Sequence, residues 1–187
     1  IIVSKWQVSI ETSPDRKDIP RQKIKLEIAN VPAHTSELSL IKNNYSAVKN
    51  NDEVMVQAET LSEVLADKLL AFPVCTKVIR YRDIWDIAWL LQQKNTALNI
   101  DLLKTKLDDY QVPEDIYLIE LDNRINAIFD IVNSSAFNQQ MSRFIDTETL
   151  DRTLRKEGFH DYLARTLSDI LVDVRQGFDG TQQGFKM

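Results

Sequence analysis

The chain has 187 residues, 43% of them hydrophobic, which is long enough to bury a core as one globular unit or two small ones. No apolar run approaches the roughly 18 residues of a membrane span, and one cysteine with two histidines is too few for an internal disulfide or a Cys/His zinc cluster. The formal net charge is −5; the first 50 residues hold eight Lys/Arg against five Asp/Glu, which is +3, so the remainder carries −8. We expect a cytoplasmic protein with no membrane contact. Its basic segment is compatible with binding nucleotides or RNA, but a patch this weak is more often a solvated surface.

Glycine is scarce and its distribution excludes two nucleotide-binding folds. The first of only four glycines is Gly158, so the first 157 residues contain no Gly-rich turn and neither a P-loop nor a Rossmann fingerprint. The sequence also opens on Ile1, without a methionine and already in strand-like sequence. We therefore expect that the native gene product extends further at its N-terminus.

The first third of the chain alternates between apolar and polar residues with the period of a β-strand. Residues 3–10 and 23–28 each have this pattern, and the turn-rich Ser13-Pro14-Asp15 lies between them, which predicts two half-buried strands in a hairpin. Two shorter strands are predicted on either side of a polar loop at 42–52, namely 38–41 and 54–56.

From residue 60 onward the pattern becomes helical. Thr60 and Glu63 have the spacing of a capping box, in which both side chains satisfy the first free amides of a helix, and Pro73 predicts that this helix ends near Phe72. Further helices are predicted at 82–94, 99–110, 114–133, 136–145, 147–156 and 159–177. The fold class is therefore α+β: a small sheet backed by helices, followed by a helical lobe, with domains at 1–95 and 96–187.

The first helix carries a lysine on its apolar face. Lys68 lies three residues after Leu65 and four after Val64, both members of the apolar stripe. A buried ammonium is costly unless it is paired, so Lys68 should face a carboxylate, a phosphate or the mouth of a cleft. The alternative is a lysine whose stem lies along apolar neighbours while its head reaches water.

Two aspartates lie near the start of the second helix. Asp83 and Asp86 are three residues apart and share a face, and Arg80 and Arg82 stand just before or beside them. Negative charge near a helix N-terminus is favoured by the helix dipole, so ordinary capping and ion pairing explain this pattern as well as a functional site does.

These two segments together resemble the conserved block of AbiEii/AbiGii-type nucleotidyltransferase toxins. The matching sequences are E-x-L-S-E-V-L-A-D-K-L-x-A at 59–71 and R-x-R-D-I-W-D-I-x-x-L-L at 80–91. The resemblance implies catalytic roles for Lys68 and Asp83 and a nucleotide-binding role for Lys68. It extends nucleotide binding to Asp86 and, more weakly, to Arg80 and Arg82. It also makes Glu63 a weak candidate for the active-site region.

The strand at 23–28 supplies a third candidate carboxylate. It is similar to the strand that carries a carboxylate in nucleotidyltransferase cores, which makes Glu27 a catalytic residue and a ligand of Mg²⁺. Ile24, Leu26 and Ile28 share one face of the strand, so Glu27 lies on the other face and needs a wet cleft for this role. The alternative is a glutamate that points into solvent.

The chain departs from the family pattern in one respect. A Gly-Gly or Gly-Ser turn and an Asp-x-Asp strand, which bind the triphosphate and magnesium in such enzymes, do not occur in it. The resemblance therefore implies a partial nucleotidyltransferase-like core that is inactive as this fragment. The intact protein would use Mg²⁺ to transfer a nucleoside monophosphate from an NTP to an acceptor such as tRNA, as the toxin of a bacterial toxin–antitoxin or phage-defence system with a cognate antitoxin. The alternative is a degenerate module that binds protein or RNA without catalysis.

Overall fold

The structure is a computed structural model that describes residues 3–18, 20–41 and 54–180. Contacts within the chain divide it into two compact units, residues 1–32 and 33–187, which are described separately below. The described residues form two small antiparallel sheets and seven helices, which confirms the predicted α+β class.

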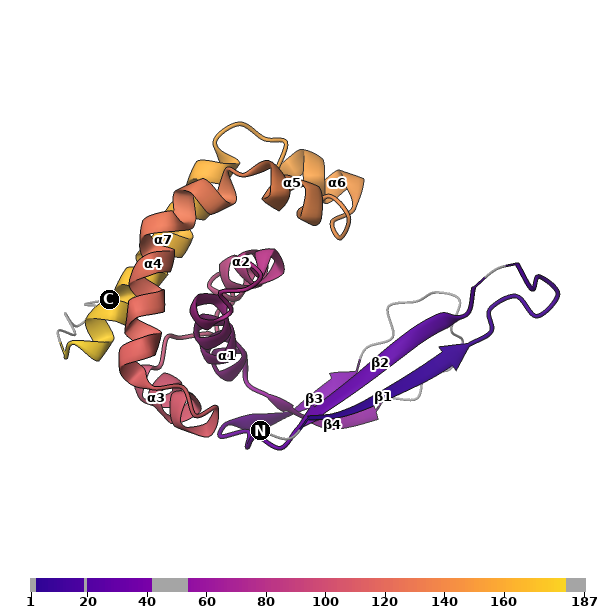
Figure 1. Cartoon of the computed structure of the whole chain (residues 1–187), viewed down its shortest axis with the longest axis horizontal. Coiled ribbons are helices and arrows are strands. Elements are labelled where there is room, and N and C mark those ends of the chain that lie inside the picture. The colour runs from indigo at the N-terminus through magenta and orange to yellow at the C-terminus, as the bar shows by residue number, and fades with distance from the viewer. Residues whose placement is uncertain (1–2, 19, 42–53, 181–187) are drawn as a thin grey trace. The chain divides into compact units, whose positions relative to one another are not determined.

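The first unit is a β-hairpin. Strand β1 (Val3–Ile10) pairs antiparallel with β2 (Gln22–Ala29), as predicted (Figure 1). Trp6 lies opposite Leu26 on an apolar face, and Lys5 lies opposite Glu27 on the polar face. Every side chain of both strands is exposed, so the prediction of half-buried strands is wrong for this unit taken by itself, because two strands alone have no layer to pack against.

The second unit begins with another hairpin. Strand β3 (Ser36–Ile41) pairs antiparallel with β4 (Val54–Glu59), and Ser36 lies opposite Glu59. Both shorter predicted strands are therefore confirmed, whereas the predicted loop at 42–52 lies outside the described residues. Strand β4 leads through Thr60 directly into the first helix, so the sheet and the helices of this unit are joined without a linker.

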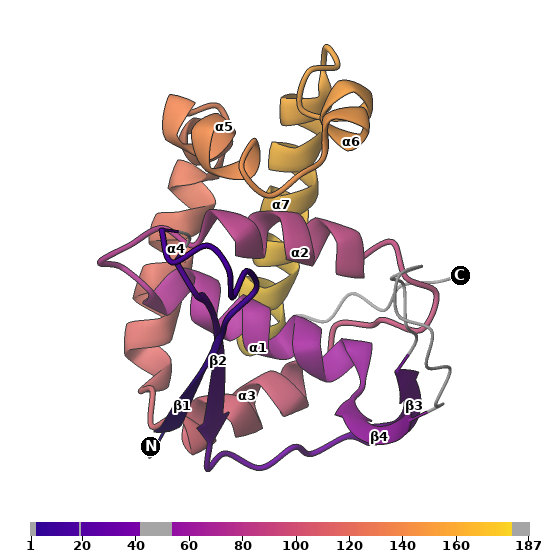
Figure 2. The ribbon, with the colours of Figure 1, turned by 90° about the vertical axis from the view of Figure 1, so that its right-hand side faces the viewer.

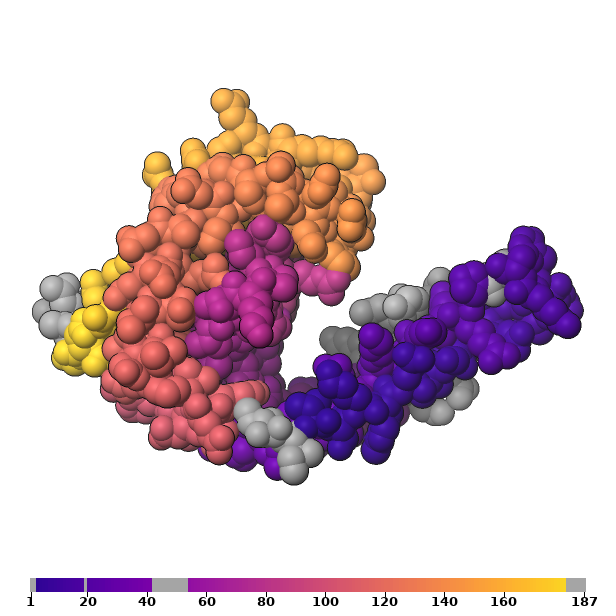
Figure 3. Space-filling model, in the orientation of Figure 1, coloured from indigo at the N-terminus to yellow at the C-terminus, as the bar shows by residue number. Residues whose placement is uncertain are grey.

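The rest of the second unit is helical, and each predicted helix is present. Helices α1 and α2 lie side by side across the long helices α4 and α7 (Figure 2). Helix α1 contacts α4, which lies beside it in the space-filling view (Figure 3), and α2 contacts α7. The helices are α1 (Leu61–Val74), α2 (Tyr81–Leu90), α3 (Ile100–Asp109), α4 (Glu114–Val132), α5 (Ser135–Met141), α6 (Thr147–Arg152) and α7 (Phe159–Phe178).

One hydrophobic core joins these helices. It combines residues of α1 and α2 with residues of the later helices, so it includes side chains on both sides of residue 95. The division into domains at that residue stays a prediction. Side chains with no exposed surface in this core include Leu65, Leu69, Phe72, Ile84, Ile87, Leu103, Tyr117, Leu121, Ile128, Phe137, Leu163, Leu167, Leu171 and Val174.

The start of α1 is capped by only half of the predicted capping box. The Thr60 hydroxyl accepts a hydrogen bond from the Glu63 amide at 3.3 Å, as expected for an N-cap. The Glu63 carboxylate does not return to Thr60. Instead it accepts the amides of His34 (2.9 Å) and Thr35 (2.5 Å), while the Thr60 amide donates to the Thr35 carbonyl. Glu63 therefore ties the segment before β3 to α1.

The end of α1 differs from the prediction because the helix continues through Pro73 to Val74. A proline has no N–H, so the carbonyl of Leu69, four residues earlier, has no helical partner. The hydroxyl of Tyr117, a buried residue of α4, donates to that carbonyl at 3.1 Å and takes the place of the missing amide. Arg124, also on α4, donates to the Phe72 and Cys75 carbonyls at 3.2 and 2.9 Å, so α4 satisfies the last turn of α1.

Candidate functional site

Lys68 of α1 and two aspartates of α2 form an ion cluster in the second unit. The Lys68 ammonium donates to Asp83 Oδ1 at 2.8 Å and to Asp86 Oδ2 at 2.6 Å. The packing of α1 beside α2 brings these side chains together, although they are far apart in the sequence. The sequence left open whether the Lys68 ammonium faces a carboxylate, a phosphate, the mouth of a cleft or water, and the structure pairs it with carboxylates. An ammonium has three N–H donors, so these two contacts leave one for a further acceptor.

The cluster includes one of the two predicted arginines. Arg80, at the N-cap position of α2, places its Nε 2.5 Å from Asp83 Oδ2, so Asp83 is held by two cations. The guanidinium of Arg82 instead lies over the ring of Phe144, 3.2 Å from its centroid. We call Lys68, Arg80, Asp83 and Asp86 the open cluster.

Exposure differs within the open cluster. The side chain of Asp83 is only 2% exposed, whereas Lys68 is 24% and Asp86 is 43% exposed. Partial burial alone would lower the pKa of Lys68, but the hydrogen bonds and charges of Asp83 and Asp86 raise it above its ordinary value. The ammonium is therefore charged at neutral pH and accessible from solvent beside Asp86.

Glu27 belongs to the first unit. It forms an ion pair with its cross-strand neighbour Lys5 at 3.0 Å, and both side chains are more than half exposed. This is the contact expected for a solvated strand glutamate. Its role as a catalytic group and metal ligand stays a prediction.

A second lysine cluster was not predicted. Lys106 of α3 is 1% exposed and its ammonium lies 2.6 Å from Glu63, 3.2 Å from Asp67 and 3.6 Å from Glu59. We call these four residues the closed cluster. The signal was present in the sequence, since Lys106 lies three residues after Leu103 and four after Leu102, the same spacing that singled out Lys68.

Hydrogen bonds in the closed cluster outweigh the effect of burial on Glu63. Burial alone would raise the pKa of Glu63, but hydrogen bonds from Lys106, the amides of His34 and Thr35 and the Thr35 hydroxyl lower it to about 2. For Asp67 and Glu59 the balance is reversed, and burial raises the pKa of both above its ordinary value. The Lys106 ammonium and Glu63 are closed to ligands because both are surrounded by protein, whereas Asp67 and Glu59 are 26% and 36% exposed.

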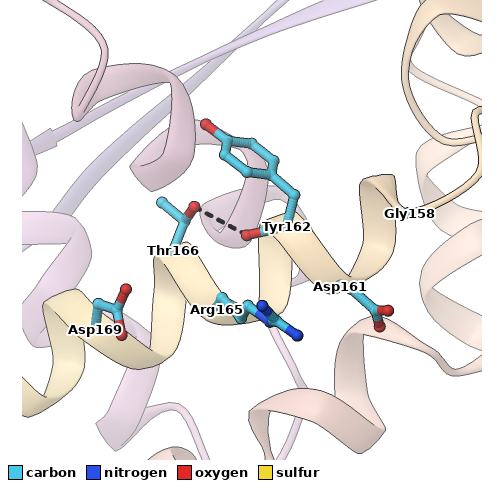
Figure 4. Close-up of a pocket in the computed structure, with 6 residues that line it drawn as sticks. All are labelled: Gly158, Asp161, Tyr162, Arg165, Thr166 and Asp169. Atoms are coloured by element: carbon cyan, nitrogen blue, oxygen red, sulfur yellow. Dashed lines mark hydrogen bonds between the residues drawn. The ribbon is translucent and has the colours of Figure 1, made fainter.

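The described residues also form hollows on the surface of the helices. An open hollow of about 460 Å³ on α7 is lined by Arg165 between Asp161 and Asp169, and Figure 4 shows the Tyr162 ring projecting to the other side of the helix from Asp161 and Arg165. A smaller hollow is lined by residues 74–78 and by Arg80 of the open cluster. Neither hollow is lined by Lys68, Asp83 or Asp86.

The residues that the structure describes do not fit a magnesium site on their own. No group of three or more His, Cys, Asp or Glu side chains among them could hold a metal ion. The two aspartates of the open cluster are already neutralised by Lys68 and Arg80, whereas Mg²⁺ takes free oxygen ligands. Among the described residues, no helix has both the length and the apolar character that a bilayer crossing requires.

A comparison with protein families shows which family the sequence resembles. The model of the family described as "Nucleotidyl transferase AbiEii toxin, Type IV TA system" matches residues 3–165. The match covers both hairpins, the open cluster and the closed cluster, and extends into α7. No curated protein and no solved structure matches the chain.

Proposed function

The chain belongs to the AbiEii nucleotidyl transferase toxin family of type IV toxin–antitoxin systems, and we propose that its open cluster binds a nucleoside triphosphate and helps to transfer the nucleoside monophosphate to an acceptor. The observation that supports this proposal is a charged, solvent-accessible lysine with one N–H unused, held in place by two aspartates of the neighbouring helix. We further propose tRNA as the acceptor, in a cytoplasmic enzyme that takes part in phage defence and is controlled by a cognate antitoxin.

In the proposed reaction, an acceptor hydroxyl oxygen forms a bond to the α-phosphorus of the triphosphate. The bond from that phosphorus to the bridging oxygen of the β-phosphate breaks, pyrophosphate leaves, and the hydroxyl proton passes to water or to a base. Negative charge increases on the leaving oxygens, and a fixed cation beside them lowers the barrier. Lys68 supplies this cation.

The contacts of the two aspartates separate their proposed roles. Asp83 is buried and bound by Lys68 and Arg80, so it orients the ammonium and has no free access to an acceptor hydroxyl. Asp86 is half-exposed and is the partner that a phosphate oxygen can displace from Lys68. We propose that Mg²⁺, when bound, neutralises triphosphate charge. Its carboxylate ligands would be groups other than those of the open cluster, and Glu27 stays a separate prediction as one of them.

The test is transfer of a labelled nucleotide from each of the four NTPs to tRNA, with protein made from the complete reading frame that contains this chain. We expect Lys68→Ala to lower transfer by about 100-fold or more, the size of effect seen when one preorganised donor to a developing anion is removed. Lys94→Ala is the matched control, because Lys94 is an exposed lysine beyond the end of α2. It should retain full activity.

The outcome separates the two functions considered. Transfer that survives Lys68→Ala would remove the open cluster from the mechanism. If the wild-type protein transfers no nucleotide to any acceptor yet binds RNA with Lys68 in place, the degenerate binding module is the correct reading.

A further inference from the structure

A pocket of about 190 Å³ lies between α2 and α7 in the second unit. It is smaller than the roughly 300 Å³ at which pockets for drug-sized ligands begin, so it suits a single ring system. None of its lining side chains is charged. The lining residues are Trp85, Ala88, Trp89, Gln92, Thr153, Phe159, Tyr162 and Leu163.

Four aromatic rings dominate the lining. The Phe159 ring contacts Trp85, with centroids 6.1 Å apart, and Tyr162, with centroids 5.9 Å apart. Trp89 and Tyr162 are 50% and 48% exposed, which is unusual for side chains of this size in contact with a core. Exposed aromatic rings with unoccupied faces are the usual platform on which proteins stack unpaired bases.

The pocket shares helix α2 with the open cluster. Trp85 directly precedes Asp86 in the sequence, and Trp89 follows it by three residues, one turn further along the helix surface. Asp86 and Trp89 share a face of α2, so a base in the pocket would lie about one helical turn from the open cluster.

We propose that this pocket holds an unpaired base of the acceptor RNA, stacked on Trp89 and Tyr162; this inference rests on the proposed function. The donor triphosphate is the less suitable occupant, because the pocket has no cation to bind its phosphates. Gln92 Nε2 and the Thr153 hydroxyl donate to the carbonyls of Ala88 and Thr149, so the side-chain oxygens of these two lining residues stay available to accept from a base edge. Stacking is tolerant of sequence, so this contact holds the acceptor strand without selecting one base.

The three tryptophans give a direct optical test. They are Trp6, in the first unit, and Trp85 and Trp89, in the pocket, so in a Trp6→Phe chain all tryptophan fluorescence reports on the pocket. We would titrate this chain with a 12-nucleotide single-stranded RNA, with the same oligonucleotide made abasic, and with Mg·ATP. We expect the intact RNA to quench the fluorescence and the abasic strand and Mg·ATP to leave it unchanged. The quenching should depend little on salt, because stacking and not phosphate contact provides the binding.

Affinity for the labelled RNA, measured by fluorescence anisotropy, completes the test. Replacing Tyr162 with Ala should weaken binding about five- to a hundredfold, whereas Tyr162→Phe, which keeps the ring, should bind like the parent chain. Circular dichroism of both variants controls for folding. Equal affinity of the Ala and Phe variants, or equal quenching by the abasic strand, would overturn the proposal. Quenching by Mg·ATP in place of RNA would overturn the choice of occupant.

This result is independent of catalysis. The Lys68→Ala chain should still be quenched by RNA, since Lys68 does not line the pocket. If transfer depends on Lys68 but Tyr162→Ala leaves RNA binding and transfer unchanged, the proposed function stands and the pocket assignment fails. An absence of quenching by the RNA would also overturn it.

Discussion

The two lysine clusters of the second unit have similar chemistry and different surroundings. In both, the ammonium of one helix lies between carboxylates of another element. Lys106 is 1% exposed and its closest partner Glu63 has no exposed surface, whereas Lys68 is 24% and its partner Asp86 is 43% exposed. The difference indicates that the closed cluster stabilises the fold and the open cluster is available for a ligand.

The largest effect is expected for removal of the buried ammonium. Lys106→Met leaves Glu63, Asp67 and Glu59 without their shared cation, and an uncompensated buried charge costs about 3–5 kcal/mol of unfolding free energy. Lys68→Met is the matched control. It should cost less than about 2 kcal/mol, because Arg80 still pairs with Asp83 and Asp86 is half in water.

Urea unfolding followed by circular dichroism measures both variants. Equal losses of stability in the two would contradict the distinction between a closed and an open cluster. A loss for Lys68→Met that exceeded the loss for Lys106→Met would reverse it.

A pH series sharpens the same comparison through Glu63. Its folded pKa of about 2 lies below the ordinary 4.5, so ionised Glu63 stabilises the fold above pH 4.5, and this stability is lost as the pH falls through 2. The shift corresponds to at most about 3 kcal/mol. The raised pKa values of Asp67 and Glu59 act in the opposite direction, because their folded forms bind protons more readily than the unfolded chain does.

The difference in unfolding free energy between wild type and Glu63→Gln isolates the contribution of the Glu63 carboxylate from those of Asp67 and Glu59. We expect the variant to be less stable at pH 7 and the two stabilities to converge between pH 4.5 and 2, as measured by urea unfolding at each pH. A constant difference across this range would show that Glu63 acts by packing or by its amide contacts and not by its charge.

The sequence predicted helix positions well because each helix has its own apolar stripe and end signals. All seven predicted helices are present. The hairpin formed by 3–10 and 23–28 follows from alternation in period two, and the shorter strands predicted at 38–41 and 54–56 are present as well. The end of α1 was misplaced because the compensation for Pro73 comes from Tyr117, a residue 44 positions later that no local pattern reveals.

Pairing between helices could be predicted only in part. The spacing at Lys68 indicated a need for a partner, and the partner proved to be Asp83 and Asp86. Lys106 was not singled out because its partners Glu59, Glu63 and Asp67, although they lie within the block at 59–71, are joined to it only by the packing of α3 against α1. Glu63 was assigned to a capping box, since local geometry allows that contact and only the tertiary fold offers it Lys106 and the Thr35 amide.

The smallest stability effect is expected at the exposed end of the open cluster. In Asp86→Asn, Lys68 keeps its bond to the buried Asp83 and loses one half-exposed ion pair, which is worth less than about 1 kcal/mol. Asp83→Asn should cost more, since it removes the common partner of Lys68 and Arg80 from a buried position.

If the open cluster serves transfer, Asp86→Asn should lower the KM for the triphosphate, because Asp86 competes with phosphate for the Lys68 ammonium. Thermal unfolding and the KM for the preferred NTP are measured on the same preparations. A variant that loses several kcal/mol of stability with an unaltered KM would place Asp86 with the structural ion pairs, and the open cluster would then differ from the closed one in exposure alone.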